Sequence, residues 1–264
     1  LSGVILTKQV SNHVKEATAA TNLTTYYQNA DTSSETALIS SLKTITSTGY
    51  KSISYTSLKN SAYSITEVTT GDYICDYYQK TYNYTLDDWG SSASAVGQGW
   101  NKEHTIPQSY WGKGETNQGC DCIIVLPTDI KCNSMRGNYP YCETNAAPFS
   151  SDSDCKLGTS SFSGYSGTVF EPLDEYKGDI ARIYYYAIVR WDGYNFTQAG
   201  GDISFSGLLE TNYGLTTYML NLLKQWHEQD PVSEWERTHN DRVQSVQGNR
   251  NPFIDHPEWA DWIW

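Results

Sequence analysis

The chain has 264 residues and a mass of 29.7 kDa, which fits one large domain or two small ones. Aromatic residues make up 14% and charged residues 18% of it. Coiled coils, collagen and wholesale disorder are excluded, because so many large rings require a packed core. The longest run of apolar and aromatic residues covers only 183–189, far short of the roughly 20 residues of a membrane helix.

The net charge of −12 and the pI near 4.7 have the wrong sign for a protein that holds a polyanion by charge alone. A protein that binds nucleic acid stably is therefore disfavoured. An enzyme that meets nucleic acid briefly at one local site stays compatible with this charge, because a metal ion and a few basic side chains reverse the potential there.

Cysteines and glycosylation sequons indicate an oxidising, secreted setting. The cysteines are even in number and lie at positions 75, 120, 122, 132, 142 and 155. The even number and the oxidising setting predict three disulfides. A zinc site is the alternative, and it is disfavoured because the cysteine spacing fits no common zinc finger. Sequons begin at Asn22, Asn83 and Asn195. The start at Leu1 is expected if a signal peptide had been removed, although an arbitrary start point would look the same.

The N-terminal half mixes an arm, a helix and short extended segments. Residues 1–31 lack periodicity and suggest an irregular arm or a loosely packed helix. The capping-box pattern at 32–35 opens a predicted helix that Gly49 ends. Aromatic and β-branched residues at 52–55 and 73–78 predict β or β-edge segments.

The C-terminal half is mainly helical. Residues 143–170 are rich in Ser, Gly, Asp and Thr and predict a long surface loop. Apolar spacing predicts helices over 178–191 and 215–226. A third helix is expected to open at Asp230-Pro231 and to end at Gly248. No domain break is needed, so the prediction is a single α+β domain, mainly helical with small β-sheets.

Two segments carry the candidate chemistry, Trp100–Pro107 and Val125–Asn138. They predict a strand, a second strand that Pro127 ends, and a helix, arranged so that Glu103 and Asn133 offer oxygen ligands to Mg²⁺ or Ca²⁺. His104 follows Glu103 and points to the opposite face of the strand, so it is placed to act as a base beside the metal without binding it.

These motifs resemble the endonuclease I family of secreted nucleases, which belong to the His-Me finger (ββα-metal) group. The matching strings are Trp100-Asn101-Lys102-Glu103-His104 and Asn133-Ser134-Met135-Arg136-Gly137-Asn138. Further blocks resemble the family at 42–55, 177–182 and 240–253. The resemblance covers roughly residues 35–260 and leaves 1–34 as an arm. The chain departs from the family at Ile123 and Ile124, where polar residues are usual.

The resemblance implies metal-dependent, largely sequence-nonspecific hydrolysis of DNA, with RNA as a second substrate, by a secreted monomer. His104 would be the general base, and Glu103 and Asn133 would hold Mg²⁺, with Mn²⁺ or Ca²⁺ as alternatives. A basic side chain would hold the phosphate, and the candidates are Arg136, Arg182 and Arg250.

The same residues allow other interpretations. Glu103-His104 alone is an ordinary dipeptide. It indicates catalysis only because it occurs among several motifs that follow the family's order along the chain. Asn138 is better explained as a helix cap than as a ligand. The other histidines, at 13, 227, 239 and 256, lie in no matching catalytic motif and are better explained as surface or structural residues. The many Tyr and Trp residues would also suit a secreted carbohydrate-binding module, although their helical spacing favours packing.

Overall fold

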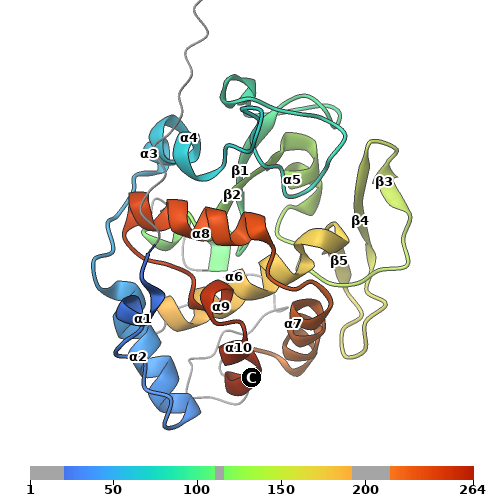
Figure 1. Cartoon of the computed structure of the whole chain (residues 1–264). Coiled ribbons are helices and arrows are strands. Elements are labelled where there is room, and N and C mark those ends of the chain that lie inside the picture. Colours follow the sequence, from blue (N-terminus) through green and yellow to red (C-terminus); the bar gives the residue numbers. More distant parts are fainter. Residues whose placement is uncertain (1–20, 111–115, 192–214) are drawn as a thin grey trace, which may run out of the picture.

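Helix α6 (Lys177–Arg190) is the element around which the other helices pack (Figure 1). The computed structural model describes residues 21–110, 116–191 and 215–264. Every residue of α6 is buried. Helices α2 (Glu35–Ser47), α7 (Thr217–Gln229) and α9 (Pro252–Asp255) pack directly against it. The predicted central helix is therefore confirmed.

The remaining helical elements are short, apart from α8 (Glu234–Gln247), which runs across the front of the molecule in Figure 1. The α-helices are α1 (Leu23–Tyr26), α3 (Tyr55–Ser57), α4 (Tyr63–Thr66), α5 (Ile130–Arg136) and α10 (Glu258–Ile263). A π-helical turn, η1 (Leu58–Ala62), joins α3 to α4. The 3₁₀ turns are η2 (Leu86–Asp88), η3 (Gln108–Tyr110), η4 (Gln118–Cys120) and η5 (Asp174–Tyr176).

Two small antiparallel sheets complete the α+β fold. Strands β1 (Trp100–His104) and β2 (Val125–Asp129) pair with Trp100 opposite Asp129 and His104 opposite Val125. Helix α5 follows β2 directly and contacts both strands, so the expected strand–strand–helix unit is present. Pro127 does not end the second strand as predicted, because β2 continues to Asp129. The second sheet, on the right of Figure 1, has the order β3 (Pro148–Ser150), β4 (Ser153–Thr159) and β5 (Thr168–Glu171).

Several boundaries differ from the prediction. Strands β3 and β4 and most of β5 lie within 143–170, so the prediction of one long surface loop is wrong there. Segment 52–55 leads into α3, and 73–78 contributes only an isolated bridge between Val68 and Ile74. Helix α8 starts after Ser233, which forms a capping box with Glu236, whereas Asp230 ends α7. Ser34, two residues beyond the predicted position, caps α2.

The cysteines correct a second expectation, because all six are buried in the structure and none forms a disulfide. Burial raises the pKa of Cys75, Cys122 and Cys155 well above the usual thiol value, which holds them as thiols. Of the three sequon asparagines, Asn22 caps α1 and is exposed, Asn83 is exposed, and Asn195 lies outside the described residues.

Aromatic side chains fill the core. Trp100, Trp191 and Trp226 are wholly buried, and so are the three consecutive tyrosines of α6. Packing therefore accounts for most of the rings that suggested a carbohydrate-binding surface. None of the helices in the described part of the chain has the length and apolar character that a membrane span requires.

Asp129 joins β2 to α5 and holds the loop before β1. Its Oδ1 accepts from the backbone N–H groups of Lys131 and Cys132, at 2.8 and 2.9 Å, and caps the helix. Its Oδ2 accepts from the Tyr84 hydroxyl at 2.5 Å and from the Gly97 N–H at 2.9 Å. One buried carboxylate therefore fixes where α5 begins.

Replacing this carboxylate tests the cap. Asp129→Ala should lower the free energy of unfolding by about 2 kcal/mol or more, because a cap and a buried tyrosine partner are lost together. Asp129→Asn is the matched control, since its amide oxygen can still cap the helix, and its loss should be smaller. Urea unfolding measures both; equal losses would contradict the capping role.

Asp76 is a second buried carboxyl in this region, and burial raises its pKa from 3.8 to about 7. Between pH 4 and 7 the Asp76 carboxyl is therefore protonated in the folded protein and ionised in the unfolded chain. The contribution of this bound proton to the free energy of unfolding is full below pH 3.8 and is lost as pH rises through 7.

The stability difference between the natural protein and Asp76→Asn should consequently shift in favour of the variant as pH rises from 4 to 7. The slope should approach about 1.4 kcal/mol per pH unit. Unfolding curves at several pH values measure it, and a difference that stays constant with pH would refute the raised pKa.

Candidate active site

Strand β1 places Glu103 and His104 side by side on the chain but in different surroundings. Glu103 is 3% exposed and turns into the protein, whereas His104 is half-buried at the strand end. Their partners across the ladder, Leu126 and Val125, are buried apolar residues of β2. The strand therefore separates the two side chains by alternation, as expected from its period of two.

One oxygen of Glu103 takes all the contacts of this carboxylate. Oε1 accepts from Arg136 Nη1 at 2.6 Å, from the Tyr78 hydroxyl at 2.6 Å and from the Tyr141 hydroxyl at 3.4 Å. Burial raises the pKa of Glu103, and Arg136 and the hydroxyls oppose that shift. Among the described residues, none donates to Oε2. That oxygen is left for another ligand.

Asn133, in the second turn of α5, likewise has one polar side-chain atom that is hydrogen-bonded and one that is not. Its Nδ2 donates to Asn101 Oδ1 at 2.8 Å and to the Lys102 carbonyl at 3.1 Å, which ties the helix to β1. No described residue donates to its Oδ1. The amide is thereby oriented with its oxygen away from the strand backbone.

The oxygens of Glu103 and Asn133 suit a hard divalent cation, since Mg²⁺ takes one or two protein oxygens and keeps several waters. The described residues contain no group of three or more His, Cys, Asp or Glu side chains placed to hold a metal ion. A cation at this pair would therefore complete its shell with water and phosphate oxygens, as a phosphate-processing site requires.

His104 is held by two contacts. Its Nε2 lies 3.0 Å from the Gly119 carbonyl oxygen, and its ring stacks on Tyr55 with centroids 5.9 Å apart and planes 12° from parallel. A carbonyl only accepts, so Nε2 carries the proton and Nδ1 keeps its lone pair. Burial, with Lys102 and Arg136 nearby, lowers the pKa of His104 to about 4. The imidazole is therefore neutral at neutral pH.

Comparison with known proteins identifies the family of this chain. The family model described as Endonuclease I matches residues 30–258. The chain belongs to the endonuclease I family. Two relatives are each named an extracellular ribonuclease: that of Bacillus amyloliquefaciens is 33% identical over 99% of this chain and 85% of its own length, and that of Bacillus subtilis is 31% identical over 91% and 78%. The protein is thus a nucleic-acid hydrolase.

Arg136 of this nuclease does not face the solvent, which gives no support to its expected role on phosphate. It is 1% exposed. Besides Glu103, its guanidinium donates to the carbonyls of His104, Thr105 and Tyr139 at 2.7, 2.9 and 3.0 Å. Arg136 therefore positions Glu103 and the end of β1.

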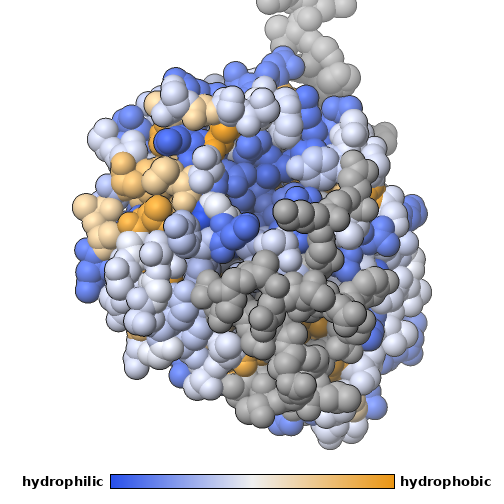
Figure 2. Space-filling model, turned by 180° about the vertical axis from the view of Figure 1, so that it is seen from behind, coloured by the Kyte–Doolittle hydropathy of each residue, from blue (hydrophilic) through white to orange (hydrophobic). Residues whose placement is uncertain are grey.

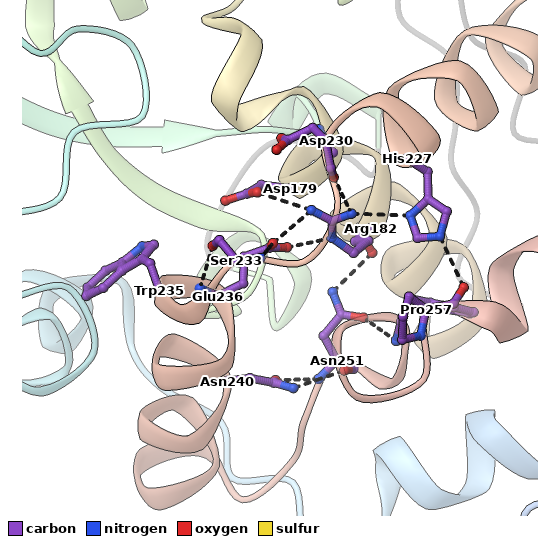
Figure 3. A network of polar contacts seen from close by, with 12 residues as sticks. Asp179, Arg182, His227, Asp230, Ser233, Trp235, Glu236, Asn240, Asn251 and Pro257 are labelled. Atoms are coloured by element: carbon purple, nitrogen blue, oxygen red, sulfur yellow. Dashed lines mark hydrogen bonds and ion pairs between the residues drawn. The ribbon is translucent and has the colours of Figure 1, made fainter.

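Arg182 and Arg250 are likewise enclosed by carboxylates. Figure 3 shows Arg182 of α6 between Glu236, Asp179, His227 and the Asp230 carbonyl, and its Nε lies 2.6 Å from Glu236 Oε1. This network joins α6 to α8 and lies apart from the contacts of Glu103. Arg250 pairs with Asp241 and Asp255. Neither arginine presents a free guanidinium to a substrate.

Residues that the sequence did not single out complete the site. Tyr78 and Tyr141 come from segments without a motif, and only the fold brings their hydroxyls to Glu103. Lys102 does carry a signal, because it lies two residues before His104 on the same strand and hence on the same face. Its ammonium donates to the Tyr55 carbonyl at 2.7 Å.

Removal of Arg136 tests its positioning role in the nuclease. Arg136→Met should destabilise the fold by about 3–5 kcal/mol, because a buried carboxylate loses its positive partner. Adding Glu103→Gln should recover part of that loss, which urea unfolding of the single and double variants measures. If the double variant lost the sum of both single losses, the two side chains would not be coupled.

Proposed function

We propose that the protein is an extracellular, metal-dependent endonuclease that cleaves phosphodiester bonds of DNA and RNA with little sequence preference. The observation that carries this proposal is one strand–strand–helix unit that holds both a neutral His104, whose Nδ1 keeps its lone pair, and two oxygens to which no described residue donates, Glu103 Oε2 and Asn133 Oδ1. This combination supplies a base and a cation site in one strand–strand–helix unit, which we assign to the His-Me finger group.

His104 acts as the general base. Nδ1 takes a proton from a water molecule as that water attacks phosphorus in line with the leaving 3′ oxygen. The Gly119 carbonyl keeps the other ring nitrogen protonated and so fixes the tautomer throughout. Stacking on Tyr55 fixes the plane of the ring. The low pKa keeps the base unprotonated over the neutral range.

Glu103 and Asn133 would hold the cation, with Mg²⁺ as the expected ion and Mn²⁺ or Ca²⁺ as alternatives. When bound, this ion would supply charge stabilisation to the pentacovalent phosphate and to the leaving oxygen. Arg136, Tyr78 and Tyr141 keep Glu103 fixed through Oε1 and so direct Oε2 to the substrate side.

The choice of substrate and location rests on the relatives. Both are named as extracellular ribonucleases, which supports RNA as a substrate and secretion as the destination. A base that activates water has no need of a 2′ hydroxyl, so DNA is a substrate by the same chemistry. Products should carry 5′ phosphates, and cyclic 2′,3′ phosphates from RNA would contradict water as the nucleophile. We expect a monomer.

Two variants separate the roles of the base and the ligand. His104→Ala should lose several orders of magnitude in kcat on plasmid DNA while Mn²⁺ still binds, because His104 does not touch the cation. Asn133→Ala should weaken Mn²⁺ binding, and excess Mg²⁺ should restore part of its activity since water can replace the lost ligand. Calorimetric titration and nicking assays measure both.

Chelation of the unmodified protein is the control and should abolish cleavage. The assignment fails if His104→Ala cleaves at a near-normal rate, or if it loses the cation as completely as Asn133→Ala does.

A further inference from the structure

Aromatic rings and ammonium groups alternate in a row that leads away from His104. The ring of Tyr55 stacks on His104 at 5.9 Å, and Lys102 Nζ lies 3.2 Å from the centre of the Tyr55 ring. The same ammonium lies 5.2 Å from the centre of the Trp89 ring, and Lys59 Nζ lies 4.8 Å from it. Three contacts therefore connect the catalytic ring to Trp89.

This row has the length of a short piece of nucleic acid. A stacked strand advances about 3.4 Å per nucleotide, so a chain with one phosphate at His104 reaches Trp89 within a few nucleotides. In the view from behind, hydrophilic residues gather in a hollow at the level of β1 and α5, whereas apolar residues gather toward the side of β3–β5 (Figure 2). The surface around β1 is thus polar.

Trp89 is rigidly mounted at the far end of the row. It is half-buried and packs edge-on against the fully buried Trp100, with centroids 5.2 Å apart. It also lines a groove of ≈ 400 Å³ together with Tyr82, Gly97 and the acidic Asp88. Such a groove has room for a nucleobase next to the indole, where stacking is favourable with any base.

Lys59 provides the charge. No described carboxylate lies within ion-pair distance of its ammonium, so its charge is not neutralised by a neighbouring side chain. The flexible side chain can leave the indole for a phosphate oxygen and expose the ring face to a base. Positive charge beside stacking rings is the combination that holds single-stranded nucleic acid.

We propose that Trp89 and Lys59 form a nucleotide-binding subsite for the unpaired strand on one side of the cleaved bond, with Trp89 stacking on a base and Lys59 contacting its phosphate. The subsite gives the nuclease a preference for single strands, because a paired base cannot enter the groove. This inference rests on the proposed function for the position of the cleaved bond.

Variants of the subsite are tested on a 12-nucleotide oligothymidylate and on a thymidine trinucleotide. Trp89→Leu, which keeps an apolar contact with Trp100, should lower kcat/KM on the longer strand about tenfold, mainly through KM. The trinucleotide should lose less than twofold, because it is too short to span the row. Trp262→Leu on α10 is the control, since it makes the same substitution at an exposed tryptophan outside the row.

Binding is measured separately in EDTA, by fluorescence anisotropy of the same labelled strand and of a fully paired hairpin. Lys59→Ala should weaken single-strand binding about threefold and make the salt dependence shallower by about 0.7 in log–log slope, as one lost phosphate contact requires. Lys43→Ala, on α2, which packs against α6 and α10, is the charge control.

Two results would overturn the subsite. If Trp89→Leu and Lys59→Ala bind the single strand as their controls do, the row only stabilises the fold. If they weaken hairpin binding as much as single-strand binding, Trp89 does not stack on unpaired bases. If Trp89→Leu does not fold, the salt dependence of single-strand binding by Lys59→Ala is the deciding measurement, and an unchanged slope would overturn the subsite. If the unmodified protein binds the single strand but cleaves no nucleic acid, the proposed function is refuted while the binding subsite is still supported.

Discussion

The buried ion pair between Glu103 and Arg136 is the interaction on which the site depends. A carboxylate that is 3% exposed is costly without a positive partner, and Arg136 supplies one at 2.6 Å. The same guanidinium binds the carbonyls of His104 and Thr105, so it ties α5 to the end of β1. Because the pair and two tyrosine hydroxyls occupy Oε1 alone, the geometry of Oε2 is set in advance, as a preorganised ligand requires.

The electrostatics of the molecule follow from that arrangement. The chain is acidic overall, and the buried Arg136, Arg182 and Arg250 are already paired with carboxylates. Attraction for a polyanion therefore has to come from a local source. In our account it comes from a cation at Glu103 and Asn133 and from the lysines beside Tyr55 and Trp89.

Local patterns predicted the parts of the fold that local physics decides. Apolar spacing was sufficient for α6 and α7, and Gly248 ends α8 with the left-handed backbone that glycine favours. The second sheet was missed because its strands are short and lie in a segment rich in Ser, Gly, Asp and Thr, whose composition signals a loop. The motif placed Glu103, His104 and Asn133 in one unit. It could not reveal that Arg136 faces inward, since a basic residue after a ligand suggests phosphate until its burial is known.

The position of a bound divalent cation tests the central claim most directly. Anomalous diffraction from crystals soaked in Mn²⁺ should show one strong peak about 2.1 Å from both Glu103 Oε2 and Asn133 Oδ1, with His104 Nδ1 outside the coordination shell. A peak bonded to His104, or a site that leaves Glu103 and Asn133 without the ion, would contradict the account, because His104 would then be a ligand and not the base.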